Sequence, residues 1–345
     1  MKKNEALILP ERRTDFLPFS LTKKRYLAVS KRFKKIYIEI SNVCNLQCTF
    51  CPEVVRGKQF MTPQLFKKVA TEAAPLTEVV CFHLMGEPLL HPEFENYLNI
   101  CAALGLRVEL TTNGILLDEK RIDALMNPVL KQINFSLQSF ESNFPDRDNT
   151  SYLQKIFDLT LRALRERPDL YIYYRLWNEG APGAEESNDR MFEKIRRGLH
   201  VDFNPSADGR RHKSIHLKGL VHIHKDVRFE WPHPDRPIRS KKGFCYGLSS
   251  QMGILADGTV VPCCLDKEGV INLGNCGSKR LDHIMRSPRA KAVREGFKNG
   301  ILVEDLCQKC TYIERFDSQA KRIEIRKNGE NNLNFEKNAP IAQVL

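Results

Sequence analysis

The chain has 345 residues, 42% of them hydrophobic, so it can bury the core of one large domain, alone or with a small second one. No run of about 18 apolar residues occurs, which argues against a membrane span. The N-terminal apolar run is too short for a signal peptide, and a cytoplasmic protein is expected.

The formal net charge of +12 is concentrated near the N-terminus, where residues 1–35 hold eleven Lys or Arg and three acidic residues. This basic arm could meet a phosphate-rich partner or an acidic substrate, although a run of charge is more often a solvated surface. Nucleic acid is possible but not favoured as a partner, because basic motifs interleaved with aromatic residues are missing.

From residue 36 onward, apolar runs alternate with amphipathic stretches. The apolar runs predict strands near 36–41, 78–84, 106–112, 131–137, 170–177 and 215–223. The amphipathic stretches predict helices near 63–74, 92–104, 118–126, 149–166 and 189–199, with Thr62, Asp118 and Asn149 as N-caps. This alternation predicts an α/β fold with a parallel sheet, either doubly wound or curved into a partial barrel, whose chemistry lies beyond the carboxyl ends of the strands.

Segments without periodicity divide the chain further. Residues 178–188 and 203–213 have the composition of loops, and residues 231–237 hold three prolines that cannot continue a helix or a central strand. The predicted organisation is a basic extension (1–35), an α/β domain (36–228), a linker (229–242), a cysteine-rich domain (243–316) and a polar tail (317–345).

Cys44, Cys48 and Cys51 follow the first predicted strand with C-x3-C-x2-C spacing. Soft thiolate ligands suit both iron–sulfur clusters and zinc, but zinc sites usually use paired C-x2-C units. A four-iron cluster held by three cysteines keeps one iron without a protein ligand, and chemistry can take place there.

This spacing, with Phe50 before the third cysteine, resembles the motif of radical S-adenosylmethionine (SAM) enzymes. The resemblance extends over roughly residues 36–225 and implies a partial (β/α)6 TIM-type barrel. It implies a [4Fe-4S] cluster that binds SAM and cleaves it to a 5′-deoxyadenosyl radical, which abstracts a substrate hydrogen. An electron donor such as flavodoxin or ferredoxin is then needed as a partner.

The ends of the next strands resemble the SAM-binding positions of that family. The segment 85–88 is similar to its GGE-type motif, although Met85 replaces the usual first Gly, and many relatives have Asp where Gln138 stands. Arg175 would pair with the SAM carboxylate, or else serve as a structural salt-bridge partner. The residues that the resemblance assigns to cofactor binding are Phe50, Met85, Gly86, Glu87, Asn113, Ser136, Gln138 and Arg175.

The second cysteine group begins with Cys245-x12-Gly258-x4-Cys263, where Asp257-Gly258 predicts a hairpin turn that returns Cys263 toward Cys245. Cysteine spacing alone favours a zinc site. Beside the first group, however, the pattern resembles the twitch or SPASM-like domain, which implies that Cys245, Cys263, Cys307 and Cys310 bind an auxiliary [4Fe-4S] cluster. Four further cysteines are expected to be packing residues, namely Cys81, Cys101, Cys264 and Cys276.

The resemblance favours oxidation of a small polar substrate such as a carbohydrate or aminocyclitol, with the auxiliary cluster accepting or relaying an electron. No leader-binding domain is expected at the N-terminus, which makes a peptide-modifying or protein-modifying maturase the alternative. Redox-neutral epimerisation, RNA modification and a non-enzymatic metal-binding protein are further alternatives. No catalytic acid or base is assigned, since His83, His222 and His224 are expected in polar packing and Trp177 and Trp231 in core and linker packing.

Overall fold

The computed structural model of the protein describes residues 33–205, 214–228, 230–318 and 320. Most of the predicted basic arm, residues 206–213 of a predicted loop and most of the predicted polar tail lie outside the described residues. Within these described ranges, no helix combines the length and the apolar run that crossing a membrane requires.

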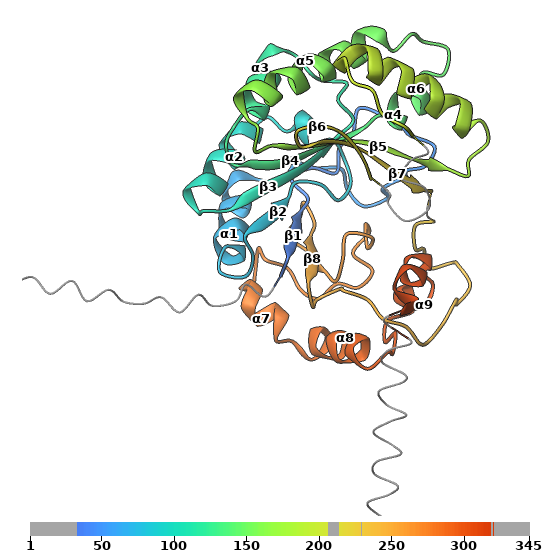
Figure 1. Ribbon diagram of the computed structural model, residues 1–345. Helices are drawn as coiled ribbons and strands as arrows, with labels where there is room; N and C mark the ends of the chain where they lie inside the picture. Colours follow the sequence, from blue (N-terminus) through green and yellow to red (C-terminus); the bar gives the residue numbers. More distant parts are fainter. Residues whose placement is uncertain (1–32, 206–213, 229, 319, 321–345) are drawn as a thin grey trace, which may run out of the picture. The chain divides into compact units, whose positions relative to one another are not determined.

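The centre of the fold is a nine-stranded sheet with the strand order β6-β7-β5-β4-β3-β2-β1-β8-β9 (Figure 1). Its barrel part consists of parallel strands: β1 (Lys35–Ile38), β2 (Val79–Cys81), β3 (Arg107–Thr112), β4 (Leu130–Ser136), β5 (Tyr171–Glu179) and β7 (Val221–Val227). Because parallel neighbours need long crossover connections, helices separate these strands along the chain. The predicted partial barrel is confirmed.

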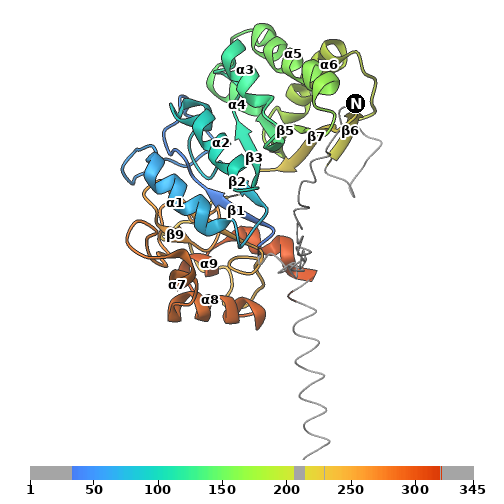
Figure 2. The ribbon, with the colours of Figure 1, turned by 90° about the vertical axis from the view of Figure 1, so that its left-hand side faces the viewer.

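Helices cover the outer face of this sheet (Figures 1 and 2). They include α1 (Pro63–Ala73), α2 (Phe94–Ala103), α3 (Glu119–Leu125), α5 (Thr150–Glu166) and α6 (Ala184–Leu199). Thr62 and Asp118 cap α1 and α3 as predicted, because their side chains accept hydrogen bonds from the third residue of the helix at 3.3 and 2.8 Å. Asn149 is the N-cap residue of α5 as predicted, but its side chain makes no capping hydrogen bond, because its oxygen accepts from Lys194 of α6 instead.

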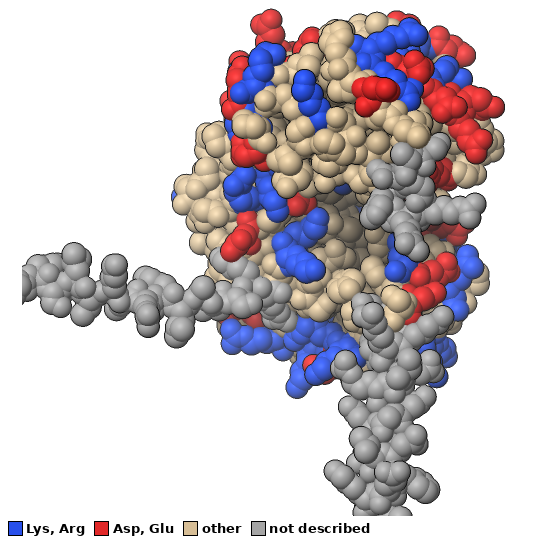
Figure 3. Space-filling model, in the orientation of Figure 1, with Lys and Arg blue, Asp and Glu red and all other residues tan. Residues whose placement is uncertain are grey.

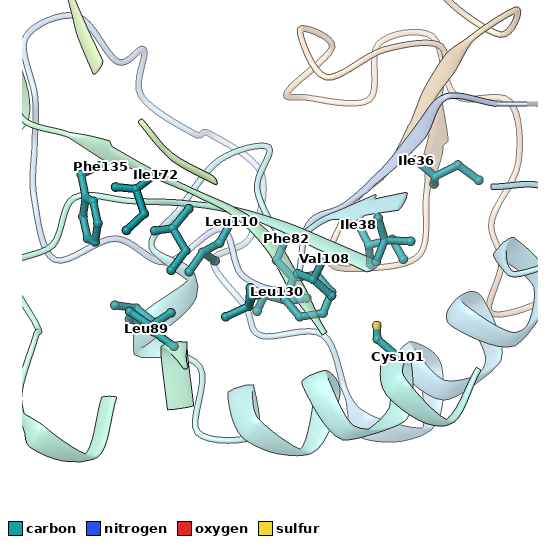
Figure 4. Packing of buried hydrophobic residues seen from close by; sticks show 14 of the residues in the cluster. Ile36, Ile38, Phe82, Leu89, Cys101, Val108, Leu110, Leu130, Phe135 and Ile172 are labelled. Carbon is teal, nitrogen blue, oxygen red and sulfur yellow. The ribbon is translucent and has the colours of Figure 1, made fainter. Parts of the chain in front are cut away.

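The core lies between the sheet and these helices, as Figure 4 shows for ten labelled side chains. Ile36 and Ile38 of β1 and Val108 and Leu110 of β3 are fully buried there, together with Cys101 of α2. Cys81 is also fully buried, on β2. The packing role predicted for Cys101 is therefore confirmed, whereas Cys81 lies on the inner face of the sheet, where its Sγ donates to Glu109 Oε2 at 3.6 Å.

The opposite, inner face of the strands is polar. Side chains alternate between the faces of a strand, so the residues between the buried ones point away from the helices. On β1 these are Lys35 and Tyr37, and on β5 they include Arg175 and Trp177, all of them partly exposed. A complete TIM barrel fills its interior with branched apolar side chains, whereas this partial barrel keeps a polar inner wall.

Two sequence predictions about the last part of the barrel are wrong. The run 215–223 is not one strand but a hairpin, in which β6 (Ser214–Lys218) is followed by a turn at residues 219–220 and pairs antiparallel with β7. Residues 178–188 are not a long loop, because β5 continues to Glu179 and α6 begins at Ala184. Gly180 and Gly183, with φ of 80° and 70°, allow the short return between them.

The cysteine-rich region continues the same sheet. β8 (Gln251–Ile254) lies parallel to β1, with Ile38 opposite Ile254, and forms a hairpin with β9 (Val260–Val261). The predicted Asp-Gly turn is confirmed, with Gly258 at φ 89°. The region also contains α7 (Leu281–Met285), α8 (Pro288–Lys298), α9 (Asp305–Gln308) and the 3-10 helix η2 (Thr311–Phe316). The exact domain boundaries stay a prediction.

Candidate active site

Both cysteine groups face one cavity of about 950 Å³. Its wall includes every cysteine of the first group (Cys44, Cys48 and Cys51) and of the second group (Cys245, Cys263, Cys307 and Cys310). Figure 3 shows the face of the molecule hollowed near its centre. The strand order explains this meeting, because β8 places the cysteine-rich region directly beside β1, whose following loop carries the first group.

The loop with the first cysteine group is closed at its base. Ser41 and Phe60 form an isolated antiparallel bridge, and the Asn42 side chain donates to Gly57 O at 2.9 Å and accepts from Gln59 N at 2.6 Å. The loop therefore leaves the sheet and returns to it at one point. Local hydrogen bonding then holds the cysteines at the cavity without further secondary structure.

The Cys48 sulfur lies in an environment that favours the thiolate. A hydrogen bond from Cys51 lowers the pKa of Cys48 to about 6, and Ser139 and Asn143 act in the same direction. The Asn143 amide donates to the Cys48 sulfur at 3.1 Å. Since the thiolate is the form that binds metal, the donor set fits an iron–sulfur cluster at this loop.

The turn after β2 packs closely on the first cysteine loop. Gly86 has φ 77°, and a Cβ on it would lie 2.4 Å from Ser41 O, so only glycine fits. Glu87 is 2% exposed, and its carboxylate accepts hydrogen bonds from Leu89 N (3.0 Å), Thr112 Oγ1 (2.7 Å) and Asn113 N (2.7 Å). Burial raises the pKa of Glu87. This carboxylate joins the ends of β2 and β3 and also faces the cavity.

Most of the predicted cofactor-binding residues line the cavity. Asn113 donates to Asn45 Oδ1 at 2.9 Å and has its amide nitrogen 4.0 Å from the Cys44 sulfur. Gln138 is the exception: it begins the short helix α4 (Gln138–Asn143), is absent from the cavity wall, and its buried Oε1 has no partner among the described residues. The predicted residues that do line the cavity are Phe50, Met85, Gly86, Glu87, Asn113, Ser136 and Arg175.

Arg175 presents a cation without an ion pair within the described part of the chain. Its Nη1 donates to Thr111 Oγ1 at 3.2 Å, its Nε is buried without a partner there, and its guanidinium lies 4.6 Å from the Trp177 ring centroid. Burial lowers the pKa of Arg175. The charge of Glu109 acts on this guanidinium, but no described carboxylate forms an ion pair with it, and it is available for an anionic group of a ligand.

Sequence reasoning missed several residues of the cavity wall. Trp177 was expected in the core, but the alternation of β5 places it on the inner face with Arg175, where its Nε1 donates to His224 Nδ1 at 3.4 Å. Trp231 was expected to pack in the linker and lies on the cavity wall. The one sequence signal for Trp177 is the alternation of β5, in which every second residue from Ile172 to Leu176 is apolar or aromatic and buried, so that Trp177 falls on the other face.

Cys264 also differs from expectation, and His83 lies on the same cavity wall. Cys264 was expected to be a packing residue, yet it lines the cavity beside Tyr37. The His83 ring packs edge-on against the Tyr37 ring at 5.4 Å, and its buried Nδ1 has no partner in the described structure. Burial lowers the pKa of His83, so the imidazole is neutral. Cys276 is fully buried, as its predicted packing role requires.

The second cysteine group is more buried than the first. Burial raises the pKa of Cys245 to about 11 and also raises the pKa values of Cys263, Cys307 and Cys310. Charge on Cys245 contributes to the shifts of Cys263 and Cys307, so these thiols lie near one another. Four half-buried thiols that share one wall fit a cluster, because bound metal supplies the charge that stabilises thiolates shielded from water.

In the described segments, no three Cys, His, Asp or Glu side chains converge as they would around a single metal ion. The two cysteine regions are connected by the ion pair of Glu39 with Arg56.

Glu39 is fully buried and accepts hydrogen bonds from Arg56 Nη2 at 2.5 Å, from Met85 N at 3.2 Å and from Ala256 N at 3.0 Å. Arg56 also donates to Lys267 O at 2.6 Å. Glu39 thus joins the first cysteine loop to the segment that follows β8.

The chain matches the family model of the radical SAM superfamily over residues 38–174 and that of SPASM, an iron–sulfur cluster-binding domain, over residues 245–311. It is 30% identical over 294 residues to the S-adenosyl-L-methionine-dependent 2-deoxy-scyllo-inosamine dehydrogenase of Niallia circulans, an alignment that covers 83% of this chain and 95% of that protein. It is 25% identical to the GTP 3′,8-cyclase of Aquifex aeolicus, in an alignment that covers 68% of this chain and 78% of that protein.

Among solved structures, Streptococcus suis SuiB bound to precursor peptide SuiA has a similar fold, with a TM-score of 0.52 and 17% identity over 83% of this chain and 73% of that one. The family models match the two regions that carry the two cysteine groups. The chain belongs to the radical SAM superfamily and is an enzyme whose cofactors are SAM, a SAM-binding [4Fe-4S] cluster and an auxiliary cluster in its SPASM domain.

Proposed function

We propose that the enzyme oxidises a small polar substrate, such as a carbohydrate or aminocyclitol, in a dehydrogenase-type reaction. The observation that carries this proposal is the single cavity onto which both cysteine groups open. The relative named 2-deoxy-scyllo-inosamine dehydrogenase supports it, because the alignment covers 95% of that protein. The cavity volume of about 950 Å³ is also within the usual range for small-molecule sites.

In this proposal Cys44, Cys48 and Cys51 hold the SAM-binding cluster. When bound, SAM and the reduced cluster supply a 5′-deoxyadenosyl radical that removes a hydrogen atom from the substrate. The hydrogen bonds to the Cys48 sulfur keep this ligand ready as a thiolate. Gly86 allows the turn after β2 to approach the cysteine loop, which places backbone and the Glu87 carboxylate beside the cluster site.

The remaining predicted SAM contacts lie at the ends of β3, β4 and β5. Asn113 and Ser136 offer amide and hydroxyl groups to the polar parts of SAM. Arg175 would bind the SAM carboxylate, since no described carboxylate forms an ion pair with its guanidinium and Trp177 fixes its orientation. Phe50 and Met85 contribute apolar wall, so that water is kept from the reacting centre.

Cys245, Cys263, Cys307 and Cys310 would hold the auxiliary cluster. With four protein ligands, that cluster has no iron free for substrate, and its role is to accept or relay an electron from the oxidised substrate. The polar inner wall, formed by Tyr37, His83 and Thr111 among others, faces the same cavity and would orient the substrate hydroxyl or amine groups.

The test uses the anaerobically reconstituted enzyme with SAM, dithionite and 2-deoxy-scyllo-inosamine. The expected result is 5′-deoxyadenosine formed one-to-one with a ketone product, without reductant consumption in each turnover. SAM cleavage that this compound neither accelerates nor couples to product would contradict an aminocyclitol substrate. Reductant consumed in proportion to product would contradict the electron-accepting role of the auxiliary cluster.

A further inference from the structure

An apolar surface patch lies over the second cysteine group. Ile238, Ile301 and Val303 are 50%, 50% and 45% exposed, and they are three of the seven strongly exposed large hydrophobic residues in the described ranges. Single exposed apolar residues are ordinary, but a group of them indicates an interaction surface. We call these three residues and the basic residues around them the auxiliary patch.

Backbone hydrogen bonds bring the parts of the auxiliary patch together. Leu302 N donates to Lys241 O at 2.9 Å, and Lys242 and Ile301 form an antiparallel bridge. Leu302 is 1% exposed, whereas its neighbours Ile301 and Val303 are about half exposed. This alternation points Ile301 and Val303 to the same outer side, while Leu302 anchors the segment in the core.

Basic side chains surround this apolar centre. Exposed Arg239, Lys241, Lys242 and Lys298 belong to the segments that the backbone hydrogen bonds join. Lys241, Lys242 and Lys298 make no ion pair within the described part of the chain, and Arg239 approaches Glu230 only at 3.7 Å. Nearby Glu304 is already paired with Arg289 at 2.7 Å. Exposed Glu295 and Asp305 lie in the same segments, so the four basic side chains outnumber these two acidic ones and the auxiliary patch carries a net positive charge.

The floor of the auxiliary patch is the cysteine segment itself. Gln308 stands between Cys307 and Cys310, and its carbonyl accepts hydrogen bonds from Arg239 N at 2.8 Å and Ser240 N at 3.1 Å. The Gln308 side chain donates to Leu302 O at 2.8 Å. Cys307 and Cys310 face the cavity on the inside, so one layer of chain separates the auxiliary patch from the auxiliary cluster site.

We propose that the auxiliary patch docks an acidic protein that carries a one-electron centre, and that it exchanges electrons with the auxiliary cluster there. This rests on the proposed function, in which the auxiliary cluster receives one electron from the substrate radical. Through the carrier this electron can return to the SAM-binding cluster, which takes up one electron for each SAM cleaved, so that no reductant is consumed over a turnover. Each exchange passes one electron between the carrier and this site and transfers no atom. Charge complementarity would steer the carrier, and the apolar centre would bring it into close contact.

The same features argue against two other occupants. A second copy of the chain would place this positive surface against itself in a two-fold contact, and like charges repel. Single-stranded RNA prefers basic surfaces with aromatic side chains on which bases stack, whereas the centre of the auxiliary patch is aliphatic. An acidic protein surface with an apolar centre matches both the charge and the chemistry.

The test measures binding of an acidic flavodoxin, and separately of a ferredoxin, to the reconstituted enzyme at low and high salt. The variant K241E/K242E/K298E should weaken binding at least about tenfold at low salt and lose most of its salt dependence. The control K67E/K155E/R190E makes the same change of charge at exposed positions of α1, α5 and α6 that form no ion pair with any described residue. It should bind within about twofold of the parent.

A second variant, I301S/V303S, keeps the charges and should weaken binding while preserving the salt dependence. SAM cleavage driven by dithionite, which needs no carrier, should be equal in all variants, so a defect in the proposed function would be seen separately. Equal losses in the patch and control variants, or no salt-sensitive binding of either carrier, would overturn the proposal. So would self-association or RNA binding that K241E/K242E/K298E abolishes.

Discussion

The two cysteine regions differ in how the chain builds them. The first lies within eight residues of one loop, where Cys44 and Cys51 are exposed and donors surround Cys48. The second is assembled from residues on either side of the β8–β9 hairpin and from the region of α9, separated by more than forty residues, and its cysteines are half-buried. A local, open site suits a cluster that must bind SAM, and a less exposed, non-local site suits one that only passes electrons.

The largest effect is expected from removing the first group. The triple substitution of Cys44, Cys48 and Cys51 by Ala should abolish 5′-deoxyadenosine formation and lower the iron content from about eight to about four atoms per chain. Iron analysis and the cleavage assay measure both. Cleavage that survives would show that the exposed loop is not the SAM-binding site.

Removing part of the second group should separate cleavage from product formation. Replacing Cys307 and Cys310 by Ala should also lose about four irons, yet leave SAM cleavage with dithionite while product formation falls below detection. Product and 5′-deoxyadenosine are quantified in the same samples. Replacing Cys276, which is buried away from the cavity, by Ala is the control and should retain all the iron.

The link between the two regions can be broken at Glu39. Glu39→Gln leaves the Arg56 guanidinium without its buried partner and should lower the free energy of unfolding by about 3–5 kcal/mol. Denaturant unfolding measures this loss. Glu166→Gln removes a surface pair with Arg162 at 2.8 Å and should leave the unfolding midpoint nearly unchanged. Equal effects of both substitutions would contradict the linking role of Glu39.

A smaller effect is expected where the turn after β2 meets the first cysteine loop. Gly86→Ala forces a Cβ to within 2.4 Å of Ser41 O at a positive φ, and should cost about 1–3 kcal/mol of stability and reduce SAM cleavage. Gly57→Ala, in the same loop region but with no atom within 4 Å of its Cβ, is the matched control. Indistinguishable variants would show that this close approach is not required.

The smallest effect is expected in the pH dependence of alkylation of Cys48 and Cys245, measured in protein without its clusters. Because the pKa of Cys48 is lowered to about 6, its alkylation by iodoacetamide should level off above pH 7. The pKa of Cys245 is raised to about 11, so its alkylation should still increase at pH 9. Peptide mass spectrometry at several pH values resolves the two. If alkylation of Cys48 and Cys245 depended on pH in the same way, the predicted difference between their pKa values would be contradicted.

Much of the fold and of the first cysteine site could be predicted from the sequence. The C-x3-C-x2-C loop, the alternation of strands and helices and the Asp257-Gly258 hairpin depend on residues close together in the chain. Local backbone preferences, caps and periodicity specify such features. Family resemblance added the chemistry, because it connects these local motifs to known cofactors.

Only the tertiary structure decided which distant residues share the cavity. The pairing of β8 with β1 brings both cysteine groups together, and it joins Glu39 to Ala256. It also places Cys264 on the cavity wall, although the sequence suggested packing. Spacing along the chain cannot give these contacts, because strand order and the choice of inner face are fixed by burial of the whole sheet rather than by any local segment.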